Sequence, residues 1–594
     1  MPKQSKSSCV LVSAIASVGY GRLKFEIAVR VGLVMSALGR LLRVARGRAG
    51  LVAAGSAVAV ATASSRSESA AFVLPPALED ESESVDEVVN WSMTHSCNPK
   101  AYFSPESGAA VQRLLSVMHE VGGRLRVVGS KLSPNGLGLS DEAMLDMVHC
   151  SAVLSVDVEA QQATVQAGAR VSDVVEALRP HGLTLQNYAS IAEQQIGGFL
   201  MVGAHGTGAC VPPVDEQMVR IKLHTPALGE MMLSATENPG LFYLAKVSMG
   251  WLGVVSEVTI QCVPAHKLVQ RTFVATRSDV REHHLDNLLH QHMRYMWIPN
   301  TDTVVVVTCD LCDDENVERV INAHRPPDEV KATTELRELL MTTSKAKGKA
   351  IKERKAREMN FAQLRDALLA LGPLDKQHVI NVNRAEAAYW HKVQGWRVDW
   401  SDKLLGFNCG GHQWVSEVAM PCGSYARPDL QDMAYMEELL AMIEASDLPT
   451  PAPIEQRWTR RSAAKMSPAH SENEDDLHSW VGIIMYLPSE DEGQRLAITK
   501  RFWEYNALCR RELWPKFGCH QHWAKIELPD DPAELSRMRE RLAERYPLQE
   551  LYAAKRKLDP KGVLGNTLID TLLLPEHALP AERRRALERA RGEW

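Results

Sequence analysis

Apolar residues between about 99 and 264 alternate between helical and strand spacing over short distances, with glycines at most of the joints. The spacing predicts helices over 109–121 and 171–178 and strands over 124–128, 163–167 and 253–262. Ser172 or Asp173 is expected to open the second helix, since short polar side chains favour that position. This close mixing of helix and strand is typical of an α+β fold.

The chain after residue 264 is less regular. A polar stretch over 313–357 ends in a segment rich in lysine and arginine, residues 345–357, which we interpret as a solvated insertion or an exposed helix. Residues 534–557 are helical in composition, and residues 581–591 predict a charged terminal helix. We find no internal repeat.

The N-terminus differs from the rest of the chain in charge. Residues 1–67 carry ten lysines and arginines against one acid, Glu26, and the arginines of residues 28–48 are spaced among apolar residues. This pattern resembles a mitochondrial presequence, with a flexible basic tail as the alternative. The apolar run over 51–63 is shorter than the roughly 20 residues of a membrane-spanning helix. We expect residues 1–72 to be a presequence and linker.

Composition excludes several classes of protein. The 594 residues have room for about two to four domains. A net charge of −6 gives no basic field for nucleic acid, and eleven cysteines are too few and too scattered for a disulfide scaffold. Cys309 and Cys312 form a CxxC without a second such pair, so no metal site is expected.

Two glycine-rich segments are the strongest candidates for ligand binding. The first, VGSKLSPNG over 128–136, follows a predicted strand, and its glycines let backbone N–H groups converge on phosphate oxygens. The second runs from LQNYAS at 185–190 to GAHGTG at 203–208 and could line a dinucleotide or form a turn between core strands. Neither a P-loop nor a Rossmann fingerprint is present.

Two polar pairs near the C-terminal end could carry chemistry. Glu455 and Arg457 are two residues apart, so on a strand they share one face, as a substrate-binding pair or as a structural salt bridge. His522 and Lys525 lie three apart, and the histidine alone would more often be structural. We interpret Asp215 and Glu216 as part of a domain-junction loop rather than as paired acid and base catalysts.

Taken together, these motifs resemble a known family. The two glycine segments, PPVDEQ at 212–217, TDTVV at 301–305, APIEQRW at 452–458 and HWAK at 522–525 are similar to the sugar-lactone oxidoreductases of the vanillyl-alcohol-oxidase FAD fold. The similarity runs from about residue 88 to 574 and is strongest to the mitochondrial dehydrogenases of plants and algae in that family.

The resemblance implies a domain plan. A PCMH-type FAD-binding domain of two subdomains would span residues 88–267, and an α+β cap domain over the substrate would span 268–480. Residues 481–594, with a helical C-terminal segment, would complete the flavin site.

The resemblance also assigns roles to residues. The expected cofactor-binding residues are Val128, Gly129, Ser130, Lys131, Leu132, Ser133, Asn135, Gly136, Ala189, Ser190, Gly197, Gly198, Gly203, His205, Gly206, Thr207, Gly208, Val254 and Lys525. The expected catalytic residues are Glu455, Arg457, Lys525, His522 and Ala189. Leu132 stands where many relatives bond FAD covalently through histidine, so FAD is expected to be held non-covalently. Ala189 stands where oxidases often have glycine, which favours a dehydrogenase.

The partners implied are L-galactono-1,4-lactone as substrate, cytochrome c as electron acceptor, and complex I assembly intermediates. The expected location is the intermembrane-space side of the inner mitochondrial membrane, with peripheral attachment and with ascorbate as product. Rival interpretations are an oxidase or dehydrogenase for L-gulono-lactone and an assembly protein that retains the fold. Cys409 matches a family cysteine near the substrate, where oxidation could block turnover.

Overall fold

The computed structural model describes residues 74–591, apart from 314–316, 319, 321–326 and 407–409. The expected presequence, residues 1–72, and Cys409 lie outside the described residues. The described residues all belong to one compact unit. Within the described ranges, no helix combines the length and the hydropathy needed to cross a bilayer.

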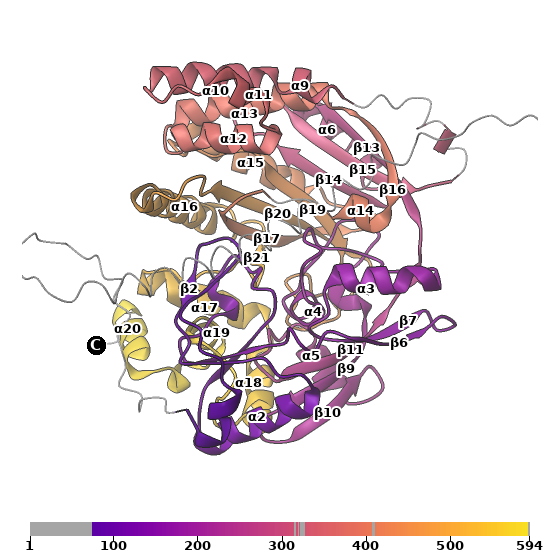
Figure 1. Cartoon of the computed structure of the whole chain (residues 1–594), viewed down its shortest axis with the longest axis vertical. Helices are drawn as coiled ribbons and strands as arrows, with labels where there is room; N and C mark the ends of the chain where they lie inside the picture. The colour runs from indigo at the N-terminus through magenta and orange to yellow at the C-terminus, as the bar shows by residue number, and fades with distance from the viewer. Residues whose placement is uncertain (1–73, 314–316, 319, 321–326, 407–409, 592–594) are drawn as a thin grey trace, which may run out of the picture. The chain divides into compact units, whose positions relative to one another are not determined.

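Two main sheets come from residues 101–261, and the strands of the larger one lie in the lower part of Figure 1. A parallel sheet has the order β3 (Ala101–Phe103), β5 (Ala143–Asp146), β4 (Leu125–Val128). An antiparallel sheet has the order β10 (Gly229–Ser234), β9 (Met218–Thr225), β11 (Val254–Gln261), β7 (Gln162–Gln166), β6 (Val153–Asp157). Two short pairs are β1 (Val88–Val89) with β2 (Ser96–Cys97) and β8 (Leu183–Thr184) with β12 (Val263–Pro264).

Helices of the same region are α2 (Gly108–Val121), α3 (Val171–Leu178), α4 (Ile196–Met201) and α5 (Pro239–Ala245), with 3₁₀ turns η1 (Pro76–Glu81), η2 (Gly136–Gly138), η3 (Arg179–His181) and η4 (Val214–Gln217). α2 begins where the Ser107 side chain accepts a hydrogen bond from the Ala110 N–H. The predicted helices and strands of this region are confirmed. The predicted cap of α3 was wrong, because Arg170 precedes the helix and makes no side-chain cap.

A nine-stranded sheet crosses the upper part of the structure. Its order is β16 (Gly395–Trp400), β13 (Lys267–Ala275), β15 (Val304–Leu311), β14 (His292–Trp297), β19 (Ile454–Arg460), β20 (Asp476–Tyr486), β17 (Gln413–Ser424), β18 (Arg427–Pro428), and β21 (His520–Gln521) also pairs with β17. The expected division at residue 480 falls within β20.

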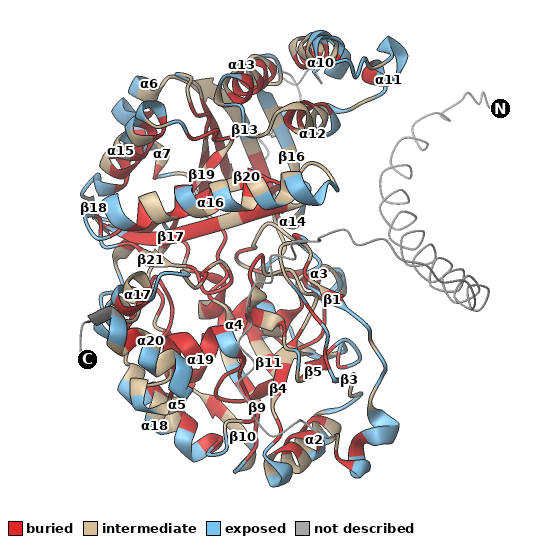
Figure 2. Ribbon diagram, turned by 90° about the vertical axis from the view of Figure 1, so that its left-hand side faces the viewer, coloured by how far each residue is buried: buried red, intermediate tan, exposed pale blue. Residues whose placement is uncertain are grey.

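The two faces of the nine-stranded sheet have different partners. On one face, alternate apolar residues pack against α15 (Gln431–Ala445) and α16 (Glu492–Glu512), as Figure 2 shows for α16, with α6 (Arg277–Glu282) and α7 (His284–Asn287) nearby. In β20 these residues are Val481, Ile483 and Met485. The intervening residues of the central strands therefore face the N-terminal sheets, because side chains alternate along a strand.

A helical insertion carries the lysine-rich and arginine-rich stretch. It comprises α9 (Glu329–Ala332), α10 (Thr334–Ala346), α11 (Glu353–Arg357), α12 (Phe361–Leu371) and α13 (Lys376–Lys392), followed by α14 (Ser401–Leu405). Leu336, Leu340, Leu364 and Leu368 form a small core of its own. The basic side chains of residues 345–357 are exposed, so the predicted exposed helical segment is confirmed.

The C-terminal chain returns to the N-terminal sheets through α17 (Pro532–Arg545), α18 (Leu548–Leu558) and α19 (Thr567–Leu573), then ends in η5 (Glu576–Ala578) and α20 (Ala581–Arg591). The Leu125 N–H donates to the Val563 carbonyl at 2.7 Å. The Asn566 side chain donates to the carbonyls of Gly136, Leu137 and Leu139, at the end of the first glycine segment and in and just after η2. The N-terminal part is therefore completed by residues from the other end of the chain.

Candidate active site

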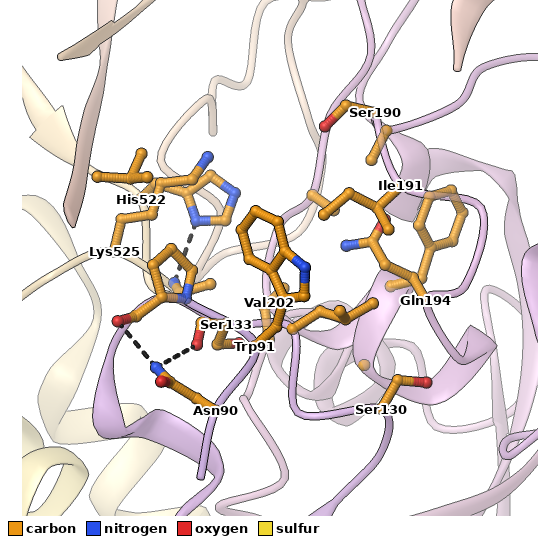
Figure 3. A pocket seen from close by; sticks show the side chains of 18 of the residues that line it. Asn90, Trp91, Ser130, Ser133, Ser190, Ile191, Gln194, Val202, His522 and Lys525 are labelled. Atoms are coloured by element: carbon orange, nitrogen blue, oxygen red, sulfur yellow. Dashed lines mark hydrogen bonds between the residues drawn. The ribbon is translucent and has the colours of Figure 1, made fainter. Parts of the chain in front are cut away.

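A cavity of about 560 Å³ lies between the nine-stranded sheet and the N-terminal part. One wall is formed by β14, β19, β20 and β17, and the other by the two glycine-rich segments. Figure 3 shows His522 and Lys525 on one side of this cavity and Ser190, Ile191 and Gln194 on the other. Its volume is in the range of small-molecule and cofactor sites.

The first glycine-rich segment leaves β4 and lines the cavity from Val128 to Pro134. Lys131 has a φ of +56°, and its ammonium turns aside to Asp146 at 2.9 Å. The Asn90 side chain donates to the carbonyls of Ser133 and Pro134, each at 3.0 Å, as Figure 3 shows. These contacts hold the loop so that its backbone faces the cavity.

The last residues of the first glycine-rich segment make structural contacts. Asn135 and Gly136 lie outside the cavity lining. The Asn135 amide donates to the carbonyls of Trp523 and Ile526 at 2.9 and 2.8 Å. Asn135 thus ties the glycine segment to the HWAK motif, and so brings two parts of the expected site together.

The second segment is divided between lining and packing. Ala189, Ser190, Gly197, Gly198 and His205 line the cavity. Gly203, Gly206, Thr207, Gly208 and Val254 do not, although sequence analysis expected them to bind the cofactor. The reason at one position is packing, since a Cβ on residue 206 would lie 1.8 Å from Asn187 Oδ1.

Three buried polar atoms on the cavity residues Arg126, Gln194 and Gln195 have no hydrogen-bond partner among the described residues: Nη1 of the arginine and Oε1 of each glutamine. Burial lowers the pKa of Arg126 to about 10. Its other nitrogens donate to the carbonyls of Leu137 and Met249. Because buried polar groups are nearly always paired, these atoms fit a polar ligand in the cavity.

A cluster of charged side chains lies on the wall formed by the strands, where His205 of the second glycine segment joins it. Arg457 Nη2 donates to Glu417 Oε1 at 2.8 Å, and Arg457 Nε lies 3.5 Å from Glu455 Oε2. Lys525 and His205 both contact the other oxygen of Glu417, His205 through Nε2 at 3.0 Å. The structure therefore brings Glu455, Arg457 and Lys525 together, as expected, around a carboxylate that sequence analysis did not single out.

Electrostatics fix the charges in this cluster. Burial alone would raise the pKa of Glu417, but Lys525, His205 and Arg457 hold that pKa well below its usual range. Burial lowers the pKa of His205 to about 4, assisted by Arg457, and burial and Lys525 lower the pKa of His522 well below its usual range. His205 places its two ring nitrogens 3.0 Å from Glu417 Oε2 and 3.0 Å from the Gly206 carbonyl, and as a neutral ring it donates to only one of these acceptors. Its ring also stacks on Trp480, with centroids 3.8 Å apart.

The same cluster contains three residues of types that bind metals. Ligand atoms of His205, Glu417 and His522 lie within 4.8 Å of one another. Both oxygens of Glu417, however, are already paired with Lys525 and Arg457. A metal cation would be repelled by these two positive charges, so we interpret the group as a charge-pairing network.

Glu417 was missed because its signal in the sequence is weak. It is the only charged residue of strand β17, whose Val415 and Glu417 face the cavity while Val418 and Met420 pack under the helices. A charged residue inside such a strand is unusual, since buried charges need partners. Its partner His205 is 212 residues away in sequence, and spacing alone cannot reveal that contact.

Buried neutral histidines make stability depend on pH. Burial lowers the pKa values of His205 and His292 to about 4 and that of His478 to about 3, from 6.5. The unfolded chain binds these protons first, so the stabilisation is complete above pH 6.5 and is lost as pH falls towards 4. At pH 5 each of these histidines is expected to lower the free energy of unfolding by about 2 kcal/mol. Urea unfolding at pH 7 and pH 5 measures this loss of stability. A His478→Gln variant should show a smaller difference in the free energy of unfolding between the two pH values. Equal stability of the wild-type protein at both pH values would contradict the prediction.

Comparison with known proteins first identifies the class of protein. The fold matches that of cholesterol oxidase from Brevibacterium sterolicum, with 16% identity and a TM-score of 0.64 over 85% of this chain and all of the other. A solvent-stable cholesterol oxidase matches with 14% identity and a TM-score of 0.65 over 84% of this chain and all of the other. Residues 99–233 match the FAD binding domain family. The chain therefore contains an FAD-binding domain and falls in the class of flavoproteins, and the unpartnered polar atoms of the cavity fit that cofactor.

The family follows from the rest of the chain. Residues 258–572 match the D-arabinono-1,4-lactone oxidase family. L-galactono-1,4-lactone dehydrogenase 1, mitochondrial, of Oryza sativa subsp. japonica is 46% identical over 82% of this chain and 83% of its own. The Arabidopsis thaliana protein of the corresponding name is 46% identical over 82% of each chain, and the Bos taurus L-gulonolactone oxidase is 28% identical over 81% of this chain and 97% of its own. The chain belongs to this family of aldonolactone oxidoreductases, as the sequence motifs predicted.

Proposed function

We propose that the protein is a mitochondrial dehydrogenase that oxidises L-galactono-1,4-lactone to L-ascorbate and passes the electrons to cytochrome c. The observation that carries this proposal is the placement of Glu455 and Arg457 on the cavity wall, beside Lys525. The names and 46% identity of the plant relatives support the choice of lactone and compartment.

The oxidation removes a hydride and a proton from the lactone. FAD, when bound, would supply a hydride acceptor and the one-electron chemistry that a haem acceptor requires. Glu455 accepts the hydrogen bond and the proton of a ring hydroxyl, and Arg457 holds the neighbouring oxygen and stabilises its developing negative charge. Lys525, held by Glu417, would place a positive charge beside the cofactor, where it would stabilise negative charge.

The first glycine segment would cover the diphosphate of FAD, and Ala189, Ser190, Gly197 and Gly198 would line the rest of its path. Leu132 lines the cavity and offers no nucleophilic atom. FAD is therefore held without a covalent bond. Residues 88–267 and the returning C-terminal helices would form the FAD-binding part, and the nine-stranded sheet the cap over the substrate.

Residues 1–72 would direct the protein to the mitochondrion and then be removed. The intermembrane-space face of the inner membrane, with peripheral attachment, gives access to cytochrome c and to complex I assembly intermediates. The basic presequence supports this location, together with the names of the plant relatives.

Ala189 is proposed to restrict access of oxygen. It lines the cavity and is partly buried, so its methyl group can narrow a path about as wide as O₂. Ala189→Gly is expected to raise the rate of reoxidation by O₂ about tenfold or more, an effect of about 1.4 kcal/mol on the barrier. Stopped-flow mixing of the reduced protein with oxygenated buffer measures this rate. Reduction by the lactone serves as the internal control, and an unchanged reoxidation rate would count against the role.

The function is tested by anaerobic mixing of the mature FAD-loaded protein with L-galactono-1,4-lactone, followed at the flavin absorbance band. We expect bleaching that cytochrome c reverses quickly and O₂ slowly, with ascorbate as product. Reduction by L-gulono-lactone alone would move the assignment to that epimer, and fast reversal by O₂ would identify an oxidase. No reduction by either lactone would refute the proposal.

A further inference from the structure

Gly482 occupies the middle of the cavity wall. It lies in β20, in register with Glu455 of β19 on one side and with Glu417 of β17 on the other. All three residues line the cavity. One cross-strand row thus presents two carboxylates with no side chain between them.

The backbone does not require glycine at this position. Gly482 is not among the glycines with positive φ, so an L-residue can adopt its conformation. Glycine also weakens the interior of a strand, where it has no side chain to pack. A backbone explanation for Gly482 is therefore lacking.

Packing does not require glycine there either. A Cβ at this position would meet Glu417 Oε1 at 3.6 Å, Cγ at 3.9 Å and Cδ at 4.0 Å, which are ordinary van der Waals contacts. Two other cavity glycines differ, since a Cβ at Gly129 would lie 2.6 Å from Gln195 and one at Gly250 would lie 2.6 Å from Val127. At those two positions, contacts with neighbouring side chains of the protein account for the glycine.

The ion pair between Arg457 and Glu417 offers an alternative explanation. It joins β19 to β17 and must cross β20, so a large residue at 482 would disturb it. A single methyl group, however, touches Glu417 only at contact distance and leaves the pair in place. An alanine at position 482 therefore leaves the ion pair intact and tests only whether a ligand occupies the space beside it.

We infer that the missing side chain of Gly482 forms the floor of the substrate subsite and makes this residue a determinant of specificity. The lactone ring lies against the backbone of β20, with Glu455 and Arg457 at its edge. Glu417 binds three side chains of the protein, so recognition of the ring hydroxyls falls to the β19 side. This inference rests on the proposed function and extends it to the shape of the site.

The test compares Gly482→Ala with Gly395→Ala, both in FAD-loaded protein. Gly395 begins β16 at the edge of the same sheet, outside the cavity, and a Cβ there meets no atom within 4 Å. Gly482→Ala is expected to lower kcat/KM for L-galactono-1,4-lactone about 10-fold to 200-fold, the usual discrimination for one methylene-sized group. The loss should appear mainly as a higher KM. The FAD content, flavin spectrum and melting temperature of Gly482→Ala should equal those of Gly395→Ala.

Each other outcome overturns the inference. Unchanged KM in FAD-loaded Gly482→Ala would show that no substrate lies against this position. Loss of FAD or of folding in Gly482→Ala, with Gly395→Ala intact, would show that the protein itself requires the glycine. Wild-type protein that no aldonolactone reduces would refute the proposed function and this inference with it, whereas active wild type with an unaffected Gly482→Ala refutes the inference alone.

Discussion

Glu417→Gln is expected to reduce the rate of flavin reduction by about a hundredfold and to lower the melting temperature. The neutral amide leaves the charges of Lys525 and Arg457 without their shared carboxylate, and breaking a buried ion pair costs about 3–5 kcal/mol. Both cations should then shift from their positions beside the ligand, and displacements of about 1 Å can cost about 10²-fold in rate. Stopped-flow reduction and thermal unfolding of the FAD-loaded variant measure the two effects.

A matched control is available at Glu216, whose carboxylate binds the buried ammonium of Lys246 at 2.8 Å outside the cavity. Glu216→Gln should lower the melting temperature but leave the rate of reduction per bound FAD unchanged. The pair of variants thus separates loss of stability from loss of positioning. If Glu417→Gln reduced its flavin at the wild-type rate, the proposed role of the cluster would be wrong.

Arg457→Lys should be the second severe change, lowering kcat by about 10²–10³-fold, the range found when one donor to a developing oxyanion is removed. A guanidinium can bind Glu417 and present a second donor to the substrate, whereas a lysine ammonium is a single point charge. Steady-state and single-turnover kinetics with the lactone measure the loss, which should appear in kcat more than in KM.

Arg460→Lys is the control on the same strand. Arg460 pairs with Asp475 at 3.1 Å and lies over the ring of Tyr425, outside the cavity. Its replacement should leave kcat within about twofold. Equal losses in the two variants would indicate that β19 tolerates no change of arginine, and would remove the case for a specific role of Arg457.

Local patterns were enough to predict many elements and one face of the site. The two-residue spacing of Glu455 and Arg457 predicted that they would share one face if they lay on a strand, and both line the cavity from β19. The helices α2 and α20 follow directly from apolar spacing and from charge. In each case the interaction that decides the structure lies within a few residues of sequence.

The rest depends on contacts between distant parts of the chain. Glycine content could not separate Gly197, which lines the cavity, from Gly206, which is needed for close packing against Asn187. The choice between these roles is made by the neighbours that the fold supplies. The same holds for Glu417, which becomes a central charge only when β17, β19 and the HWAK loop meet.

The return of the C-terminal chain affects how the protein is made. Asn135 is held by carbonyls 388 and 391 residues later in the sequence, and Asn566 binds the loop from the other side. At about 5–20 residues per second, a ribosome needs about 20–80 seconds to cover that distance. Throughout this time the emerging N-terminal sheets lack the hydrogen bonds that shape the glycine loop. Flavin capture is therefore a late event, and a chain that stops before the last helices has no complete place for its cofactor.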